Sequence, residues 1–280
     1  MSVEVSGISI GAIEISLYLF VCYLLRRIWY KELSAINLIS YCWFVMTVLT
    51  FIWELAFICQ YKKVHDYAQV LVQNNSHVWT QSYNLTYVNP WKLSTIFYAE
   101  YGAHADREYM ELNNYWSRLI EGTHAFLCGL FATLALVFKT HKNDNLYLIS
   151  ATLSMGSQLM NSILYMGEYF QQVGDSNSPN YPSASFPLGF ALLNRGFMYV
   201  NVFWTIMPLF TIITEFIGYH KRFKRDQLIA LNIEKRQETF DSTIESLGQA
   251  STKLTEFADC LDNKIKNIDY IDYIDYIKQD

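Results

Sequence analysis

Five stretches of the chain are long and apolar enough to cross a lipid bilayer. A membrane-spanning helix needs about 20 mostly apolar residues, and stretches of this kind occupy residues 8–25, 34–59, 115–138, 146–172 and 186–217. Inside a bilayer the backbone N–H and C=O groups must form hydrogen bonds with one another, because no water is present. This requirement favours helices in segments of this length. The sequence therefore predicts an all-α, polytopic membrane protein built as a five-transmembrane-helix bundle.

Charged residues divide the chain into two parts. Residues 1–217 carry 25 Asp, Glu, Lys and Arg side chains, whereas the 63 residues 218–280 carry 22. The first part has the composition of a membrane domain and the second that of a soluble, cytosolic tail. The net charge of −5 gives no basic surplus for nucleic-acid binding. The expected partners are the lipid bilayer and an apolar molecule, and no nucleic acid.

Basic residues beside the apolar stretches predict the orientation, because Lys and Arg gather in cytoplasmic loops. They lie after the first, third and fifth stretches, as Arg26, Arg27, Lys31, Lys139, Lys142, Lys221, Arg222, Lys224 and Arg225. Lys62 and Lys63, on the other side, are exceptions. Five spans then place the N-terminus outside and the C-terminus in the cytosol. The loop at residues 60–114 becomes lumenal, in agreement with its two glycosylation sequons at Asn74 and Asn84.

The tail has an apolar residue at every seventh position. The series is Phe240, Leu247, Leu254, Leu261 and Ile268, and Ile244, Ala258 and Ile265 stand three residues before its later members. This spacing predicts a helix with an apolar seam. Ser251 interrupts the seam, so a single helix and a homodimer through the tail both remain open.

Ionisable residues within the apolar stretches are candidate functional residues, because a charge inside a membrane is costly. They are Glu14, Glu54, Glu121, His124, Glu168, Arg195 and Glu215. Each has a purely structural alternative, such as an ion pair with Arg195 or a hydrogen bond.

Several of these residues share a helix face with other polar groups. Glu121 and His124 are three apart, as are Asn201 and Trp204, and residues at that spacing are neighbours on a helix. The fourth stretch contributes Gln158, Asn161 and Tyr165. The pattern predicts a polar-lined pocket for a mostly apolar ligand. Burial disfavours a charged carboxyl group, so a Glu there can hold a proton and act as an acid.

The sequence predicts neither a metal nor a cofactor. It contains no phosphate-binding glycine loop, dinucleotide-binding pattern or zinc-protease motif. The residues His65, Asp66, His77 and His104 lack metal-ligand spacing, and the five cysteines show no paired pattern.

Five motifs occur in order within residues 41–210. They are Cys42-Trp43-Phe44 with Trp53-Glu54; Glu100-Tyr101-Gly102 with Asp106-Arg107-Glu108-Tyr109; Glu121-Gly122-Thr123-His124-Ala125; Gly156-Ser157-Gln158 with Leu164-Tyr165 and Glu168; and Asn201-Val202-Phe203-Trp204 with Pro208. Together they resemble the emopamil-binding protein family, the sterol Δ8–Δ7 isomerases of the wider EXPERA group.

The resemblance implies a multi-pass protein of the endoplasmic-reticulum membrane that binds a sterol or another polycyclic lipid. In such isomerases an acid protonates a ring double bond, and carboxylate and indole groups hold the carbocation. The resemblance makes Glu54 the proton carrier and Glu121 the group that stabilises the cation. It assigns Asn201 and Trp204 to the cradle and Tyr101 and Tyr109 to the pocket roof, and Thr50, Gln158 and Tyr165 are further candidate ligand contacts.

One departure bears on the activity. The isomerases carry a His one turn before the second-span Glu, where this chain has Thr50, and a Thr hydroxyl is no acid near neutral pH. One hypothesis is that His124 replaces that His from another helix. The alternative is a sterol- or lipid-binding EXPERA protein that is not an enzyme. The retained acidic and aromatic set favours a cofactor-free isomerase.

Overall fold

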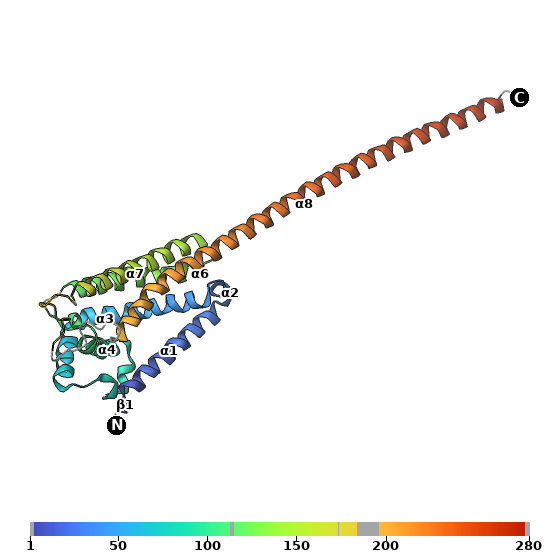
Figure 1. The fold of residues 1–280 in the computed structure, drawn as a ribbon. Coiled ribbons are helices and arrows are strands. Elements are labelled where there is room, and N and C mark those ends of the chain that lie inside the picture. Colours follow the sequence, from blue (N-terminus) through green and yellow to red (C-terminus); the bar gives the residue numbers. More distant parts are fainter. Residues whose placement is uncertain (1–2, 113–114, 173, 184–195, 278–280) are drawn as a thin grey trace. The chain divides into compact units, whose positions relative to one another are not determined.

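The computed structural model describes residues 3–112, 115–172, 174–183 and 196–277 (Figure 1). The chain forms two compact units, residues 1–219 and 220–280. In chain order the elements are β1 (Glu4–Ser6), α1 (Gly7–Ile28), α2 (Tyr30–Leu33), α3 (Leu38–Asn74), η1 (Val78–Thr80), β2 (Ser82–Asn84), η2 (Leu85–Val88), α4 (Pro90–His104), η3 (Arg107–Met110), α5 (Trp116–Thr123), the π-helical turn η4 (His124–Cys128), α6 (Gly129–Thr140), α7 (Asp144–Gln172) and α8 (Gly196–Ile277).

The prediction of a helical chain with several helices able to cross a membrane is confirmed. Within the described residues four helical segments are long and apolar enough by length and composition: Gly7–Ile28, Leu38–Asn74, Trp116–Thr140 and Tyr199–Lys266. Each overlaps one of the predicted stretches, but Leu38–Asn74 and Tyr199–Lys266 extend well past the predicted ends at residues 59 and 217. The first ten residues of the fifth predicted stretch, 186–195, and with them Arg195, lie outside the described residues.

The remaining predicted stretch forms α7, a helix of 29 residues that is not among those four. Its mean hydropathy is lowered by polar side chains on its buried face, where Ser150, Ser154, Gln158 and Asn161 lie. Its other face exposes large apolar side chains, among them Ile149, Leu153, Met160, Ile163 and Phe170. The helix is therefore polar toward the protein and apolar outward.

The predicted lumenal loop, residues 60–114, is largely folded. α3 continues past the predicted end of its span, residue 59, to Asn74, where Asn75 takes the left-handed conformation that ends many helices. α4 begins at Pro90 because the Asn89 side chain accepts a hydrogen bond from the Trp91 N–H. Aromatic and aliphatic side chains from this segment pack with α3 into one core cluster.

The N-terminus is fixed to the same folded segment. β1 pairs with β2 in an antiparallel two-stranded sheet, with Val5 opposite Tyr83. Gly7 follows, and a Cβ there would lie 2.1 Å from the Val78 carbonyl oxygen. Only glycine permits this approach. The start of α1 and the segment after α3 therefore lie at one end of the first unit.

The other end of the first unit brings together three segments that are far apart in sequence. The Glu215 carboxylate accepts hydrogen bonds from the Asn37 N–H at 3.1 Å and the Tyr147 hydroxyl at 2.8 Å, so Glu215 is a structural group in a buried network. Lys142 lies 3.6 Å from Glu32. The basic first and third loops thus meet at one end, as the orientation argument requires.

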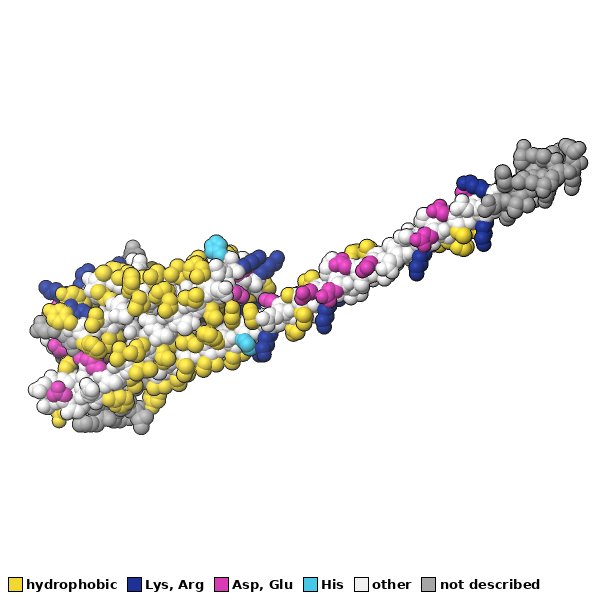
Figure 2. Space-filling view, turned by 90° about the horizontal axis from the view of Figure 1, so that it is seen from above, with side chains coloured by type: hydrophobic (Ala, Val, Ile, Leu, Met, Phe, Trp, Pro, Cys, Tyr) yellow, Lys and Arg dark blue, Asp and Glu magenta, His cyan; other side chains and the backbone are white. Residues whose placement is uncertain are grey.

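Large apolar side chains cover much of the visible surface of the first unit (Figure 2). A soluble protein rarely exposes such a continuous apolar surface. A helix bundle in lipid does, because the solvent around it is hydrocarbon.

The second unit is a single helical segment, the part of α8 after residue 219. The heptad residues of the tail, including Phe240, Leu247, Leu254 and Leu261, are all exposed. Ile268 lies beyond the residues whose side chains are described.

The two sequons differ in their local structure, and this gives a test of the lumenal assignment. Asn74 is exposed at the end of α3, whereas the Asn84 side chain accepts a hydrogen bond from the Thr86 N–H at 2.9 Å. We expect glycan mainly at Asn74, so that Asn74→Gln removes the glycosidase-sensitive mass in microsomes. Asn84→Gln is the matched control. Cytosolic protease access to residues 60–112 would contradict the orientation.

Candidate functional site

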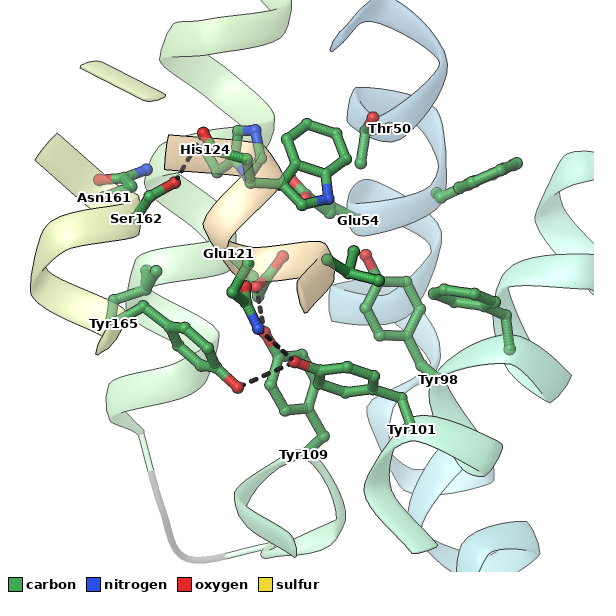
Figure 3. A pocket seen from close by; sticks show the side chains of 16 residues that line it. Thr50, Glu54, Tyr98, Tyr101, Tyr109, Glu121, His124, Asn161, Ser162 and Tyr165 are labelled. Atoms are coloured by element: carbon green, nitrogen blue, oxygen red, sulfur yellow. Dashed lines mark hydrogen bonds and ion pairs between the residues drawn. The ribbon is translucent and has the colours of Figure 1, made fainter. Parts of the chain in front are cut away.

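A hollow lies inside the first unit, between α3, α4, η3, α5, η4, α7 and α8 (Figure 3). Its cavity volume is about 120 Å³, below the range of about 300–1,000 Å³ that is typical of sites for drug-sized ligands. Its walls combine aromatic rings, such as Trp53, Phe97 and Tyr98, with a few carboxylates, amides and hydroxyls. The lining suits a mostly apolar ligand with few polar groups.

Glu54 and His124 make a close polar contact in the wall of the hollow. Their side chains come from α3 and η4, and the distance from His124 Nδ1 to Glu54 Oε1 is 2.9 Å. Only 14% of the imidazole and 4% of the Glu54 side chain are exposed. In a low-dielectric site such a contact is far stronger than at a surface.

Two further residues determine which imidazole nitrogen carries the proton. The Trp43 indole N–H donates to Gln158 Oε1 at 2.8 Å, which leaves the Gln158 amide nitrogen facing His124 Nε2 at 3.2 Å. An indole only donates and an amide nitrogen only donates, so Nε2 accepts. The ring proton is therefore on Nδ1, where it is donated to Glu54.

Glu121 is the second carboxyl group of the hollow. Its Oε1 accepts a hydrogen bond from the Tyr109 hydroxyl. Burial, and then the nearby Glu121 charge, hold the pKa of Tyr109 well above its usual value, so the phenol remains a donor. Glu54 Oε2 and Glu121 Oε2 are buried and accept no hydrogen bond from any other group, and the two carboxyl groups lie close enough to share a proton. Two carboxylates this enclosed are costly unless one holds a proton or a cation lies between them.

A close contact between two helices sets the register of these groups. At Gly129 a Cβ would lie 2.3 Å from the Phe51 Cβ. Helix α6, which begins at Gly129, can therefore pack directly on α3, one turn away from Glu54. The π-helical turn η4 immediately precedes Gly129, and such turns re-aim the side chains of a helix. This turn carries His124.

Pro208 and Ser162 act on the backbone carbonyl of Trp204. Proline has no N–H for the carbonyl four residues earlier, which here belongs to Trp204. The Ser162 hydroxyl from α7 donates to that carbonyl at 3.2 Å. The Trp204 ring packs against His124 and Trp43, with ring centroids 5.6 Å and 4.7 Å away.

A hydroxyl network closes one side of the hollow (Figure 3). Tyr101 and Tyr165 share a hydrogen bond of 2.9 Å, and Tyr165 donates to Asp106. The Asn201 amide donates to Tyr101 at 3.3 Å, and the Asn180 amide donates to Asp106 at 2.7 Å. These bonds connect α4, α7 and α8 with Asp106, the residue that caps η3.

Nearly all sequence-predicted site residues line this one hollow: Thr50, Glu54, Tyr101, Tyr109, Glu121, His124, Tyr165, Asn201 and Trp204. Gln158 does not line it. It is fully buried behind His124, so its predicted role as a ligand contact changes to one of holding the imidazole. The Thr50 hydroxyl donates to the Met46 carbonyl of its own helix at 2.6 Å.

Sequence reasoning missed some residues of the site. Tyr98 lines the hollow one turn before Tyr101, so the spacing on α4 could have revealed it. Asp106 belongs to one of the five sequence motifs. Its hydrogen-bond partner Asn180 lies in a segment without helical or strand periodicity, so no sequence pattern indicated it. Glu14 and Glu168 do not line the hollow, and each has one buried oxygen, Oε1 and Oε2 respectively, without a hydrogen-bond partner.

The residues Glu54, Glu121 and His124 also bring one potential metal-ligand atom each within 4.8 Å of one another. The donor set could hold a divalent cation as well as a proton. The sequence predicts no metal here.

Comparison of the chain with protein-family models, with curated proteins and with solved structures finds no match. The function therefore has to be argued from the geometry of the hollow and from the motifs of the sequence.

The contact at Gly129 predicts a specific sensitivity to a single methyl group. We expect Gly129→Ala to destabilise the fold by about 1–3 kcal/mol, because the added Cβ overlaps Phe51. The thermal unfolding midpoint in detergent should fall accordingly. Gly156→Ala and Gly167→Ala on α7 are matched controls, since nothing lies within 4 Å of a Cβ there. An unchanged midpoint for Gly129→Ala would refute the close contact.

Proposed function

We propose that the protein is a membrane isomerase of the sterol Δ8–Δ7 type, which shifts a ring double bond of a sterol or related polycyclic lipid without a cofactor. The observation that carries the proposal is the Glu54–His124 pair, set beside Glu121 in an aromatic hollow between apolar helices. The chemistry needs an acid, a base and a shielded place for a carbocation, and these residues supply all three.

In the proposed reaction the buried Oε2 of Glu54 carries the acidic proton. Its transfer to one carbon of the double bond forms a C–H bond and leaves a carbocation on the adjacent ring carbon. His124 Nδ1–H, 2.9 Å from Glu54 Oε1, stabilises the carboxylate formed. The Glu54 carboxylate, held by His124, then takes a proton from a ring carbon next to the carbocation. The electrons of that C–H bond form the new double bond. The acid is regenerated and nothing is oxidised or reduced.

Glu121 and Trp204 have the complementary role of stabilising the cation. Glu121 is oriented by Tyr109, and its negative charge favours a cation in a water-poor site. The electron-rich indole face of Trp204 adds a cation–π interaction. The hydroxyl network of Tyr101, Tyr165 and Asn201 offers polar partners to a ligand hydroxyl.

A sterol- or lipid-binding EXPERA protein without catalysis is the second candidate. The observation that favours it is Thr50, whose hydroxyl is bonded within its own helix where the isomerases that the sequence resembles carry His. The proximity of His124 to Glu54 favours the enzyme, because it supplies an imidazole to the same carboxyl group from a different helix.

The proposed setting is the endoplasmic-reticulum membrane, with five spans and a cytosolic C-terminal tail. In this proposal α7 joins the four long apolar helices as a further span, because its outward face is apolar although its inward face is polar. The basic loops that meet at one end of the bundle favour that end as cytosolic.

Complementation tests the activity. Expressed in cells that lack sterol Δ8–Δ7 isomerase, the protein should convert accumulated Δ8 sterol into Δ7 sterol. Glu54→Gln and His124→Ala should each lower turnover by about 10²–10⁴, the usual contribution of acid–base groups. Combining them should cost little more, because the two residues act as a unit.

Glu168→Gln is the matched control, since this carboxyl group lies outside the hollow, and it should retain turnover. Persistent Δ8 sterol with well-expressed wild-type protein in the same membrane would exclude the isomerase. Retained binding of a sterol in that case would select the second candidate. Full turnover by His124→Ala would eliminate the role of the imidazole.

For the tail we propose pairing with a second copy of the chain in a parallel coiled coil. Four residues of the seam lie at heptad position a, and two of them, Ser251 and Ala258, are small. The other two are Ile244 and Ile265, while Leu247, Leu254 and Leu261 lie at position d. Leu at d with Ile at a favours two parallel strands. These Ile and Leu side chains are all exposed in the single chain, and pairing would bury them.

Leu247→Asp combined with Leu254→Asp should therefore convert the full-length protein in detergent from a dimer to a monomer, as measured by light scattering. Gln249→Asp, off the seam, is the control for added charge and should remain dimeric. A monomeric wild-type protein would contradict the pairing.

A further inference from the structure

A second cluster of ionisable side chains lies outside the hollow. Glu100 and His104 are four apart on α4, and His77 comes from the segment between α3 and η1. α4 is outside the four candidate spans, so the cluster belongs to the folded segment at the end of the bundle where β1 pairs with β2. One ligand atom of each residue lies within 4.8 Å of the others.

The imidazole rings of His77 and His104 are close neighbours. Their centroids are 4.1 Å apart with an angle of 34° between the ring planes. His77 Nδ1 lies 2.7 Å from Glu100 Oε1, with 50% of the His77 side chain and 11% of the Glu100 side chain exposed. Two imidazoles and one carboxylate thus converge on a place that the solvent reaches from the His77 side.

Backbone groups already orient two of the three side chains. Glu100 Oε2 accepts from the Val78 N–H at 3.0 Å, which leaves Oε1 for the cluster. His104 Nε2 bonds to the Ser76 carbonyl oxygen at 3.0 Å, so Nε2 carries a proton and Nδ1 keeps its lone pair. Metal-binding histidines typically donate their second ring N–H to a carbonyl or carboxylate in this way.

We propose that His77, Glu100 and His104 bind a divalent transition-metal ion of the Zn²⁺ class. Imidazole nitrogen and carboxylate oxygen are ligands that Zn²⁺ accepts at about 2.0–2.2 Å, and two His with one Glu leave a fourth position for water. The metal replaces the direct His77–Glu100 contact, and the ligand atoms draw in around it. The proposal does not depend on the reaction in the hollow.

The ion has a structural role at this position. It ties the segment after α3 to α4, and α4 also carries Tyr98 and Tyr101, which line the hollow. A ligand that binds the folded state alone stabilises that state by mass action. Bound metal therefore fixes the wall of the hollow that α4 forms.

The alternative is a plain ion pair between His77 and Glu100, which requires no contribution from His104. The variant His104→Ala therefore separates the two interpretations. It removes a proposed ligand and leaves the His77–Glu100 contact in place.

The test uses the purified full-length protein in lipid nanodiscs, treated with a chelator, washed and titrated with Zn²⁺ alone. We expect one equivalent of bound Zn²⁺ and a higher thermal unfolding midpoint. His77→Ala and His104→Ala should each weaken the affinity at least about tenfold and reduce the rise in midpoint at a given Zn²⁺ concentration. His77 is half exposed, so its variant should keep the metal-free midpoint and control for misfolding.

Two histidines outside the cluster are matched controls. His141→Ala removes an exposed surface imidazole and should bind Zn²⁺ as the wild-type protein does. His124→Ala should also retain binding. Loss of binding in His124→Ala would place the ion at Glu54 and Glu121 and overturn the proposal, as would unchanged affinity in His104→Ala or no binding by the wild-type protein.

Discussion

The contact between Glu54 and His124 is the interaction on which the rest of the site depends. A carboxyl group deep in an apolar helix is stable only if it holds a proton or meets a partner. Here the partner comes from a different helix, at 2.9 Å. The Phe51–Gly129 contact brings the two helices together, and the π-helical turn before Gly129 carries the imidazole.

Around this contact each polar group is held by another. Trp43 orients Gln158, Gln158 fixes the tautomer of His124, and Tyr109 holds Glu121. The oxygens that accept no hydrogen bond from any other group, on Glu54 and Glu121, are on residues that line the hollow. Such preorganisation is costly for a structural core but useful where charge forms during a reaction.

Most of the apolar helices and several of the site residues could be predicted from the sequence, because the length of an apolar stretch and a three-residue spacing are local properties. They identified four of the apolar helices and placed Glu121 with His124 and Asn201 with Trp204. They could not show that Gln158 lies behind the imidazole, since that depends on the rotation of α7 against α3. The cluster of His77, Glu100 and His104 was also missed, because its third member comes from a segment without periodicity. The folded state of residues 60–112 depends on long-range pairing with β1, which no local pattern encodes.

The origin of the transferred proton tests the central claim most directly. The purified protein would be given a Δ8 sterol in deuterated buffer and the product analysed by mass spectrometry. If Glu54 is the acid, its proton exchanges with solvent between turnovers, and we expect Δ7 sterol that carries one deuterium at the newly protonated ring carbon, formed by the wild-type protein and lost in Glu54→Gln. Product without solvent deuterium, or equal labelling by Glu54→Gln, would contradict it.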